Sequence, residues 1–398
     1  MGKSTYFTGQ PVFNQLLQIL PRHVINDVVK QHQSDRYYKR FKTYEHLVTM
    51  LYTSFQRCKS LREVVTGMMA CSTRINHLGI GYMPRRSTLS EANANRKEQV
   101  FADLYHRLYA YFYPDSRLFT KLERKLFIFD STTISLFSEV MRGSGQIPVG
   151  RRKGGVKAHV LINADEDVPR FVCLTEAKEN DNIFTPMLHL PKNSIVTFDR
   201  IYYGFAPLIN WTNAGVTWVT RMHTLLAYTL LETKEVTEEQ RLSGIITDEY
   251  ILAGAHQRKD KMPARKIVYE DPITQKQLIF FTNNTQMEAI AIANIYKRRW
   301  QIESLFKRLK QNYPLKYFLG DSPNAIKIQI WCALISDLLI KIVKDKIKRH
   351  WSFSNIASMI RLHLMTYIDL MRFLQNPERT LVNYSIPYIN IQQSLFPT

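Results

Sequence analysis

The chain has 398 residues, 45% of them hydrophobic, which is enough for two or three domains with cores of their own. Lysine and arginine number 54 against 34 aspartates and glutamates, so the net charge is +20, the pI is near 9.7, and a polyanion such as nucleic acid is the expected partner. A zinc ribbon and a disulfide framework are excluded, because the four cysteines are scattered without a CxxC pair: Cys58, Cys71, Cys173 and Cys332.

The N-terminal part is predicted to be helical. Apolar residues recur at helical spacing over residues 11–113, and Pro, Gly or polar connectors interrupt them. We expect a helical DNA-binding domain over residues 1–120. Within it, "MPRRSTLSEANANR" sets Arg85 and Arg86 ahead of a Ser87 or Thr88 N-cap. Two interpretations stay open: a helix start that faces DNA, or a capped helix with solvated arginines.

A β-sheet is predicted from residue 121, in a segment that we bound at 121–223. The runs "KLFIFD", "VKAHVLIN", "RFVCLTEA" and "SIVTFD" are short, rich in Val, Ile and Phe, and separated by turn residues. The loop "RGSGQIPVGRRKGG" between two of them lacks the GxxxxGK[ST] pattern of a phosphate-binding P-loop. We expect this loop to lie over a DNA backbone or to be partly disordered.

Further strands and long helices follow. Residues 224–284 carry strand signals and many cations, which indicates a β-rich insertion. Residues 285–345 are predicted to hold one long helix that starts with Thr285 and Glu288 in capping-box register and ends before Pro314, and then a second apolar helix. Residues 346–398 are predicted to form a C-terminal helical region, with one helix and a polar tail.

No targeting or membrane segment is expected. The N-terminal "MGKSTYFTGQ" lacks an apolar signal core. The longest apolar stretch, residues 330–343, is interrupted by Asp337 and Lys341 and is too short to span a bilayer. These features predict a cytoplasmic protein.

Three acidic residues stand out. Asp130 and Asp199 each follow a strand-like run, "LFIFD" and "IVTFD", where a carboxylate serves as a cap, an ion-pair member or a metal ligand. In the cap interpretation, residues 131–132 form a turn. Glu303 lies among six cations in "YKRRWQIESLFKRLK", on one helix stripe with Tyr296, Arg299 and Lys310. An incidental pair of Arg299 with Glu303 on an exposed helix is the alternative.

The order of these motifs resembles a known family. The spacing Tyr-(2)-Arg-(3)-Glu-(6)-Lys, preceded by "FDST" and "FDRIYY", is similar to the DDE transposases of bacterial insertion sequences, and most closely to the insertion sequence four family. The blocks "RSTLSEANANR", "GGVKAHVLIN", "WVTRM", "FFTNN" and "NAIKIQIW" extend the resemblance over most of residues 10–345. The ordered set is specific, whereas the Tyr-Arg-Glu-Lys string alone could arise by chance.

The resemblance implies an α/β fold with a ribonuclease-H-like catalytic core. Residues 121–223 and 285–345 would be its two parts, separated by the insertion. Asp130, Asp199 and Glu303 would be the catalytic and metal-binding triad, with Asp130 bridging two Mg²⁺ ions and the other two carboxylates holding one each. Mn²⁺ would substitute for Mg²⁺.

The resemblance also implies contacts with DNA. Tyr296, Arg299 and Lys310 would hold phosphates near the cut, because Arg grips phosphate bidentately and Lys supplies a point charge. Further candidate DNA contacts are Arg200, Tyr202, Trp300, Lys307, Lys157, Arg85 and Arg86. Trp300 either packs in the core, the favoured interpretation, or stacks on a displaced base. His159 is expected to be a satisfied core residue.

Two positions depart from the family pattern. Ile201 stands where relatives have Gly, which puts the local turn in doubt, and Asn180-Asp181 stands where relatives have His-Asp. Neither change removes a triad carboxylate.

The function that follows is cut-and-paste transposition. The protein would bind double-stranded DNA at terminal inverted repeats, cut it, and join the 3′ ends to target DNA, in association with the nucleoid. Two ends must be cut in one complex, so a homodimer on DNA is expected, formed through the helices after residue 345. The alternatives are a ribonuclease-H-like nuclease or resolvase, and a transposase-derived DNA-binding protein that no longer cuts.

Overall fold

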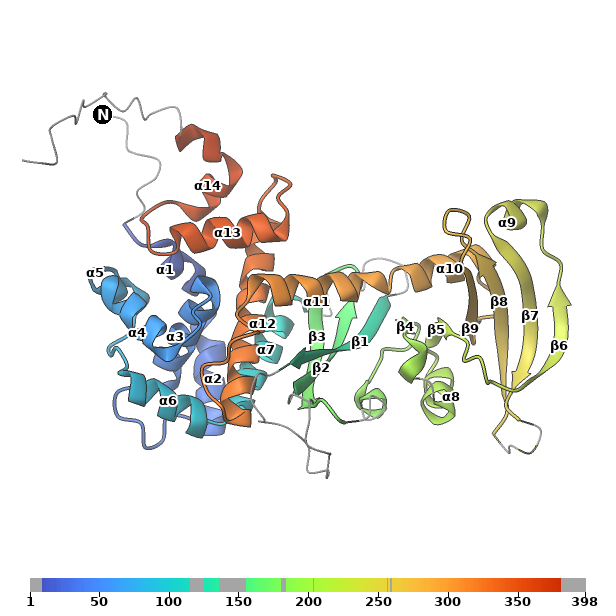
Figure 1. Cartoon of the computed structure of the whole chain (residues 1–398), viewed down its shortest axis with the longest axis horizontal. Coiled ribbons are helices and arrows are strands. Elements are labelled where there is room, and N and C mark those ends of the chain that lie inside the picture. The colour runs from blue at the N-terminus through green and yellow to red at the C-terminus, as the bar shows by residue number, and fades with distance from the viewer. Residues whose placement is uncertain are drawn as a thin grey trace, which may run out of the picture.

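The computed structural model describes residues 9–114, 125–135, 155–179, 184–202, 204–255, 257 and 260–380. The predicted loop over residues 142–155 lies almost wholly outside these ranges, as do Asn180-Asp181 and the polar tail. Figure 1 shows an elongated molecule, with a bundle of helices at one end and a β-sheet that runs to the other.

The N-terminal part is helical. Its helices are α1 (Val12–Leu17), α2 (Arg22–His32), α3 (Thr43–Gln56), α4 (Leu61–Ala70), α5 (Ser72–Ile75), η1 (Asn76–Leu78), α6 (Arg86–Asn95) and α7 (Gln99–Phe112). The long helix α12 (Pro323–Lys346) packs against α3, α6 and α7, so the bundle is completed by a segment from far along the chain (Figure 1). Because α12 is buried nearly all round, this bundle and the sheet share one hydrophobic core.

One mixed sheet holds every strand described. The strands are β1 (Leu126–Ser135), β2 (Gly155–Asn163), β3 (Val168–Glu176), β4 (Ile195–Phe198), β5 (Thr217–Arg221), β6 (Tyr228–Lys234), β7 (Ile245–Ala253), β8 (Met262–Glu270) and β9 (Gln277–Thr282). Their spatial order is β3-β2-β1-β4-β5-β9-β8-β7-β6. β1, β4 and β5 run parallel to one another, and every other neighbouring pair is antiparallel.

Helices cover both faces of the sheet. Alternate residues of β1 point to opposite faces. Ile128 belongs to the core shared with α10 (Ala289–Lys297), α11 (Trp300–Asn312) and α12, whereas Phe129 belongs to a second core that contains α8 (Phe205–Asn213). The face of β1 that carries Ile128 therefore also carries Asp130 toward α10 and α11.

The predicted single helix over residues 285–313 is wrong at its start and in its middle. The helix begins at Ala289, with Glu288 as its N-cap, and no side chain caps it. Thr285 instead belongs to a turn in which the Asn284 side chain accepts the N–H groups of Gln286 and Met287 at 3.0 and 2.7 Å. Between α10 and α11 the hydrogen bonds tighten to the i→i+3 pattern, as in Arg299 N–H to Tyr296 O at 3.0 Å.

Three other local predictions need correction. β1 continues to Ser135, so residues 131–132 form no turn after Asp130. α6 starts at Arg86, and neither Ser87 nor Thr88 is its N-cap. The C-terminal segment forms two helices, α13 (Phe353–His363) and α14 (Leu370–Gln375), followed by the short turn η6 (Pro377–Thr380).

Within the described residues no helix is both long enough and apolar enough to cross a membrane. The four cysteines are free thiols, and Cys58 and Cys332 are buried.

Candidate active site

Asp130 and Asp199 lie side by side on adjacent parallel strands. Phe129 of β1 is the register partner of Phe198 of β4, and each aspartate is the next residue. Neighbouring strands are about 4.8 Å apart, so the two carboxylates leave the sheet next to each other. Asp130 is a strand residue, whereas Asp199 follows the last residue of β4.

Glu303 joins this pair through an arginine. Arg299 donates from one terminal nitrogen to Asp130 at 3.0 Å and from the other to Glu303 at 2.8 Å. The Arg299 side chain is 8% exposed and that of Asp130 17%, so this pair is largely shielded from bulk water, whereas the Glu303 side chain is 37% exposed. The predicted pair of Arg299 with Glu303 therefore exists, but it is not incidental, because the same guanidinium holds Asp130.

A second arginine, absent from the sequence predictions, binds Asp199. Arg221 donates to the Asp199 carboxylate at 3.1 Å. Its place follows from the sheet register, because Phe198 pairs with Thr220 and the next residues are Asp199 and Arg221. The signal in the sequence was "WVTRM", a strand that ends in a cation beside two strands that lead into aspartates.

Burial and like charge act together on Asp130. Its pKa is raised to about 6, mainly because burial disfavours the carboxylate, with further contributions from Asp199 and Glu303; the Ser131 N–H and Arg299 oppose the rise. Asp199 and Glu303 are thus close enough to repel Asp130. Arginine charge offsets that repulsion in this structure.

The turn after Asp199 tolerates Ile201. The Ile201 N–H donates to the Asp199 carboxylate at 3.1 Å, and residues 200–202 form a 3-10 turn, η5. Ile201 is not among the described non-glycine residues with positive φ, so the backbone at this position does not require glycine. Its side chain is 65% exposed and displaces nothing in the core.

The carboxylates are not arranged as a ready metal site. Among the described residues no group of three His, Cys, Asp or Glu side chains is close enough to hold a metal ion. The donor chemistry nevertheless fits a hard divalent cation, because carboxylate oxygens are its preferred ligands. A cation between Asp130 and Glu303 would occupy the position that the guanidinium of Arg299 fills.

Comparison with known families decides the identity. The model of a family described as transposase DDE domain matches residues 121–338, more than half of the chain. The chain belongs to the transposase DDE domain family. A domain of unknown function, DUF4372, matches residues 8–81 of the same chain.

Curated relatives agree. A Sinorhizobium fredii protein assigned as transposase y4zB is 29% identical to this transposase over 270 residues, which are 65% of this chain and 71% of that protein. A Synechocystis protein assigned as the transposase of insertion sequence element IS4SA is 26% identical over 266 residues, with the same two coverages. The predicted resemblance to transposases of bacterial insertion sequences is confirmed, and the function is that of a DNA transposase.

A solved structure also matches the transposase at low similarity. It is the piggyBac transposase synaptic complex with hairpin DNA, with a TM-score of 0.42 and 10% identity over 97% of this chain and 85% of that chain. A likeness at this level supports no argument about the site.

The signature residues of the transposase occupy different depths. Tyr296 is 4% exposed, and its ring lies against Phe280 and between the guanidinium groups of Arg221 and Arg299. Burial raises the pKa of Tyr296. Lys310 is exposed and donates to the Thr132 hydroxyl at 2.6 Å, two residues along β1 from the first aspartate. Tyr296 is thus a buried ring in contact with both arginines, whereas Lys310 is exposed to solvent.

The remaining predicted DNA contacts are exposed at the surface, except Tyr202 and Lys157. Trp300 is 61% exposed, so the favoured core-packing interpretation is wrong. Lys307, Arg200, Arg85 and Arg86 are exposed as well. Tyr202 is buried at 2%, and Lys157 donates to the Glu179 backbone carbonyl at 2.8 Å. As predicted, His159 is a fully buried core residue, and its ring stacks on Phe184.

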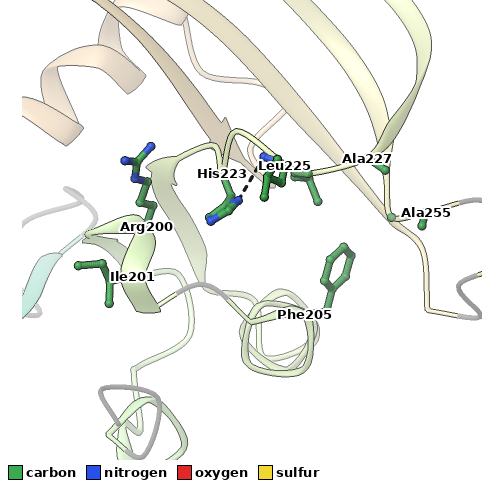
Figure 2. A pocket seen from close by; sticks show the side chains of 9 residues that line it. Arg200, Ile201, Phe205, His223, Leu225, Ala227 and Ala255 are labelled. Carbon is green, nitrogen blue, oxygen red and sulfur yellow. Dashed lines mark hydrogen bonds between the residues drawn. The ribbon is translucent and has the colours of Figure 1, made fainter. Parts of the chain in front are cut away.

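A hollow of about 480 Å³ is lined by the residues that follow Asp199 in the chain (Figure 2). Arg200 and Ile201 line it from η5, Phe205 from the start of α8, and His223 and Leu225 from the segment after β5. Arg200, which lines this hollow, is the residue directly after Asp199.

A buried ion-pair network holds the helix that carries Glu303. Arg308 of α11 donates two bonds to the Asp337 carboxylate of α12, at 3.2 and 2.9 Å. It also donates to the Asp167 carboxylate at 2.5 Å and to the Asp167 backbone carbonyl at 3.1 Å. Asp337 is 1% exposed. Asp167 belongs to the turn between β2 and β3, so one side chain ties α11 to α12 and to the sheet. In the sequence Asp337 stands out only as an interruption of an apolar run, so this role was not predicted.

Proposed function

We propose that this transposase catalyses cut-and-paste transposition of an insertion sequence, with Asp130, Asp199 and Glu303 as its catalytic residues. The observation that carries the proposal is their convergence. The two aspartates follow register partners on adjacent parallel strands, and Arg299 links Asp130 to the helix glutamate by bonds of 3.0 and 2.8 Å.

The sheet order supports a ribonuclease-H-like core as part of this proposal. Three antiparallel strands, β3-β2-β1, continue into two strands parallel to β1, β4 and β5. In that order the aspartates stand at the point where the sheet changes from antiparallel to parallel pairing. Residues 121–223 and 285–345 are then the two parts of the core. The strands of 224–284 would be an insertion that continues its sheet through β9.

Asp130, Asp199 and Glu303 would hold the divalent cations, Mg²⁺ or in its place Mn²⁺. When bound, two such ions supply charge neutralisation and activation of the attacking oxygen in phosphoryl transfer. Arg299 then exchanges its contact with a carboxylate for a contact with a DNA phosphate, which a guanidinium grips with two bonds. Lys310, exposed beside β1, adds a point charge for the next phosphate.

The substrate of the proposed reaction is double-stranded DNA. The net charge of +20 supplies the attraction, which is independent of sequence and weakens with salt. Terminal inverted repeats are the proposed binding sites, and transfer of the 3′ ends to target DNA completes the reaction. Because two ends are processed together, we propose a homodimer in the DNA complex.

The experiment that tests this proposal is strand cleavage of a duplex that carries the DNA bordering the gene, with Mg²⁺ or EDTA. Wild type is expected to cut at the repeat boundary and to join the 3′ end to a second duplex. Glu303→Gln is expected to bind the duplex as wild type does and to cut it ~10³-fold more slowly, since metal ions contribute several kcal/mol to the transition state.

A matched control is Glu288→Gln, at the exposed N-cap of α10, where the glutamate side chain makes no capping bond. This variant is expected to cut like wild type. If Glu303→Gln cuts as fast as Glu288→Gln, Glu303 is not catalytic and the proposed triad fails.

A further inference from the structure

A cationic groove lies beyond the C-terminal end of α11, and no role has been assigned to it so far. Its volume is about 590 Å³, and three segments border it: the turn from α3 to α4, the chain after α11, and the last turn of α13. Five cationic side chains line it, namely Arg57, Lys59, Lys310, Lys316 and Arg361.

Little negative charge within the chain balances these cations. Glu63 is the one acidic residue of the lining, and its carboxylate already accepts the backbone N–H of Lys59 at 2.7 Å. Across the described ranges, Arg57, Lys316 and Arg361 form no ion pair. Because five positive charges face one negative charge, the cations of the groove repel one another and together attract a polyanion.

Helix α11 connects the groove to the candidate active site. Glu303 and Lys310 are seven residues apart on this helix, which is about 10 Å at 1.5 Å per residue. Lys310 reaches Thr132 of β1 at 2.6 Å and also lines the groove. A distance of about 10 Å corresponds to about three base pairs of a duplex. One DNA molecule can therefore occupy the carboxylate site and the groove together.

An exposed aromatic ring adds a second kind of contact. Tyr317 is 46% exposed on the groove wall, and the ammonium of Lys59 lies 5.4 Å from the centre of its ring. The ring holds the lysine over the groove by a cation–π contact. The ammonium group of Lys59 is therefore held in place at the groove and is not simply a mobile surface charge.

We propose that this groove binds the phosphodiester backbone of the duplex that the enzyme cleaves, about three base pairs from the scissile bond. The inference rests on the proposed function for the position of the cut. It adds to that function a phosphate contact formed jointly by the helical N-terminal part, the end of the catalytic helix and α13. The groove contacts phosphate groups, so its contribution is independent of base sequence.

The test removes charge without disturbing the backbone. Arg57 has φ of 58°, a left-handed conformation that asparagine tolerates, so Arg57→Asn is chosen, together with Arg361→Gln. Lys276→Gln, an exposed lysine in the turn between β8 and β9, is the matched control. Binding of the full chain to a duplex of the element's own end is measured at several salt concentrations, and thermal unfolding is measured beside it.

The slope in question is that of the logarithm of the binding constant against the logarithm of the salt concentration. For the double variant its magnitude is expected to be smaller by about 1.8, since each phosphate contact contributes about 0.9. The control is expected to keep the wild-type slope. In a second arm, neutral methylphosphonate linkages replace the phosphates about three base pairs on either side of the cut. On one side they should weaken wild type and leave the double variant unaffected.

An unchanged slope in the double variant overturns the proposal, as do methylphosphonate effects that add fully to those of the substitutions. A lower unfolding temperature with an unchanged slope would show that these cations only balance helix C-termini. Failure of the proposed function looks different: wild type would bind with the groove contribution intact and would cut no duplex with Mg²⁺ or Mn²⁺.

Discussion

Arg299 is the residue on which the carboxylate site depends in this structure. Its guanidinium forms ion pairs with both Asp130 and Glu303, while the rings of Tyr296 and Trp300 lie 5.7 and 5.5 Å from it. A positive side chain between two acidic groups stabilises them when no other cation is present. The same side chain competes with a metal ion for those oxygens.

Arg299→Gln is therefore expected to have opposite effects without and with metal. Without a divalent cation the variant should lose about 1–3 kcal/mol of folding free energy, because two partly buried carboxylates lose a charged donor. With Mg²⁺ its melting temperature should rise more than that of wild type. Thermal melts with and without Mg²⁺ check this. Arg298→Gln, which removes an exposed pair with Asp165, is the control; equal Mg²⁺ shifts in all three proteins would contradict the competition.

His46 makes the helical part sensitive to acid. The ring is fully buried, Arg96 donates to its Nδ1 at 2.9 Å, and its Nε2 lies 2.7 Å from the Asn93 carbonyl oxygen. Burial, followed by the charge of Arg96, lowers the pKa of His46 to about 3. Because the folded pKa lies below the unfolded value near 6.5, the unfolded chain binds the proton first, and stability falls as pH falls below about 6.5.

The expected loss from His46 is about 1.4 kcal/mol per pH unit below pH 6.5. Urea unfolding of wild type and His46→Gln at pH 7 and at lower pH checks it. The quantity to compare between the two proteins is the slope of the free energy of unfolding against pH. The glutamine variant should be less stable at pH 7 and less dependent on pH. If both lose stability at the same rate, His46 is not the group that titrates.

Single residues of the site were predictable only where a motif marked them. The two aspartates stand out because an acidic group beside a run of apolar residues is costly to bury, and Glu303 stands out as the acidic residue in a cationic segment. Arg221 was marked only as the cation that ends "WVTRM". Its contact with Asp199 depends on the β4–β5 register, which brings together residues 22 positions apart. Burial of Tyr296 and exposure of Trp300 are likewise tertiary results, because both lie in the same cationic segment.

At the scale of elements, α11 is positioned by Arg308. Asp337 is wholly buried, and burial raises its pKa, whereas Arg308 lowers it. Asp337→Asn should cost about 3–5 kcal/mol, because the Arg308 guanidinium loses its buried charged partner and keeps only the half-exposed Asp167. It should also slow cleavage, because α11 carries Glu303. Asp345→Asn on the same helix removes a partly exposed pair with Lys341 and should cost less than about 1 kcal/mol.

Chemical denaturation and cleavage rates of these two variants measure the difference. Equal stability losses at positions 337 and 345 would show that the Arg308 network contributes no more than a surface pair.

Element types were predictable where periodicity was long, and element ends were not. The helical N-terminal part and α12 match their apolar spacing. The break between α10 and α11 contains no Pro or Gly that would predict it, and Arg298 and Arg299 keep right-handed helical backbone angles. The hydrogen bonds tighten there at the arginine that contacts both strand and helix carboxylates, so tertiary contacts decide the break.

At the scale of the whole molecule, residues 224–284 are part of the same sheet as the carboxylate strands. β9 pairs with β5, so the strands after residue 224 extend the sheet that holds Asp130 (Figure 1). Arg265 of β8 binds Asp248 of β7 with two bonds, at 2.7 and 2.6 Å, and also donates to the backbone carbonyl of Met287 before α10. Strand signals in the sequence predicted the strands but not this continuity, because pairing between distant strands leaves no local pattern.

This arrangement predicts a gradient of stability along the sheet. All four residues of β4 are buried in the centre of the sheet, whereas β6 is the edge strand opposite β3 and nearly all its residues are exposed. Amide hydrogen exchange followed by mass spectrometry should therefore show β6 exchanging through local opening and β4 close to global unfolding. Slow exchange in β6 that speeds up on dilution would mean that a second copy covers this edge by strand pairing. Slow exchange at every concentration would contradict the gradient, since it would place the edge and the centre in one cooperative unit.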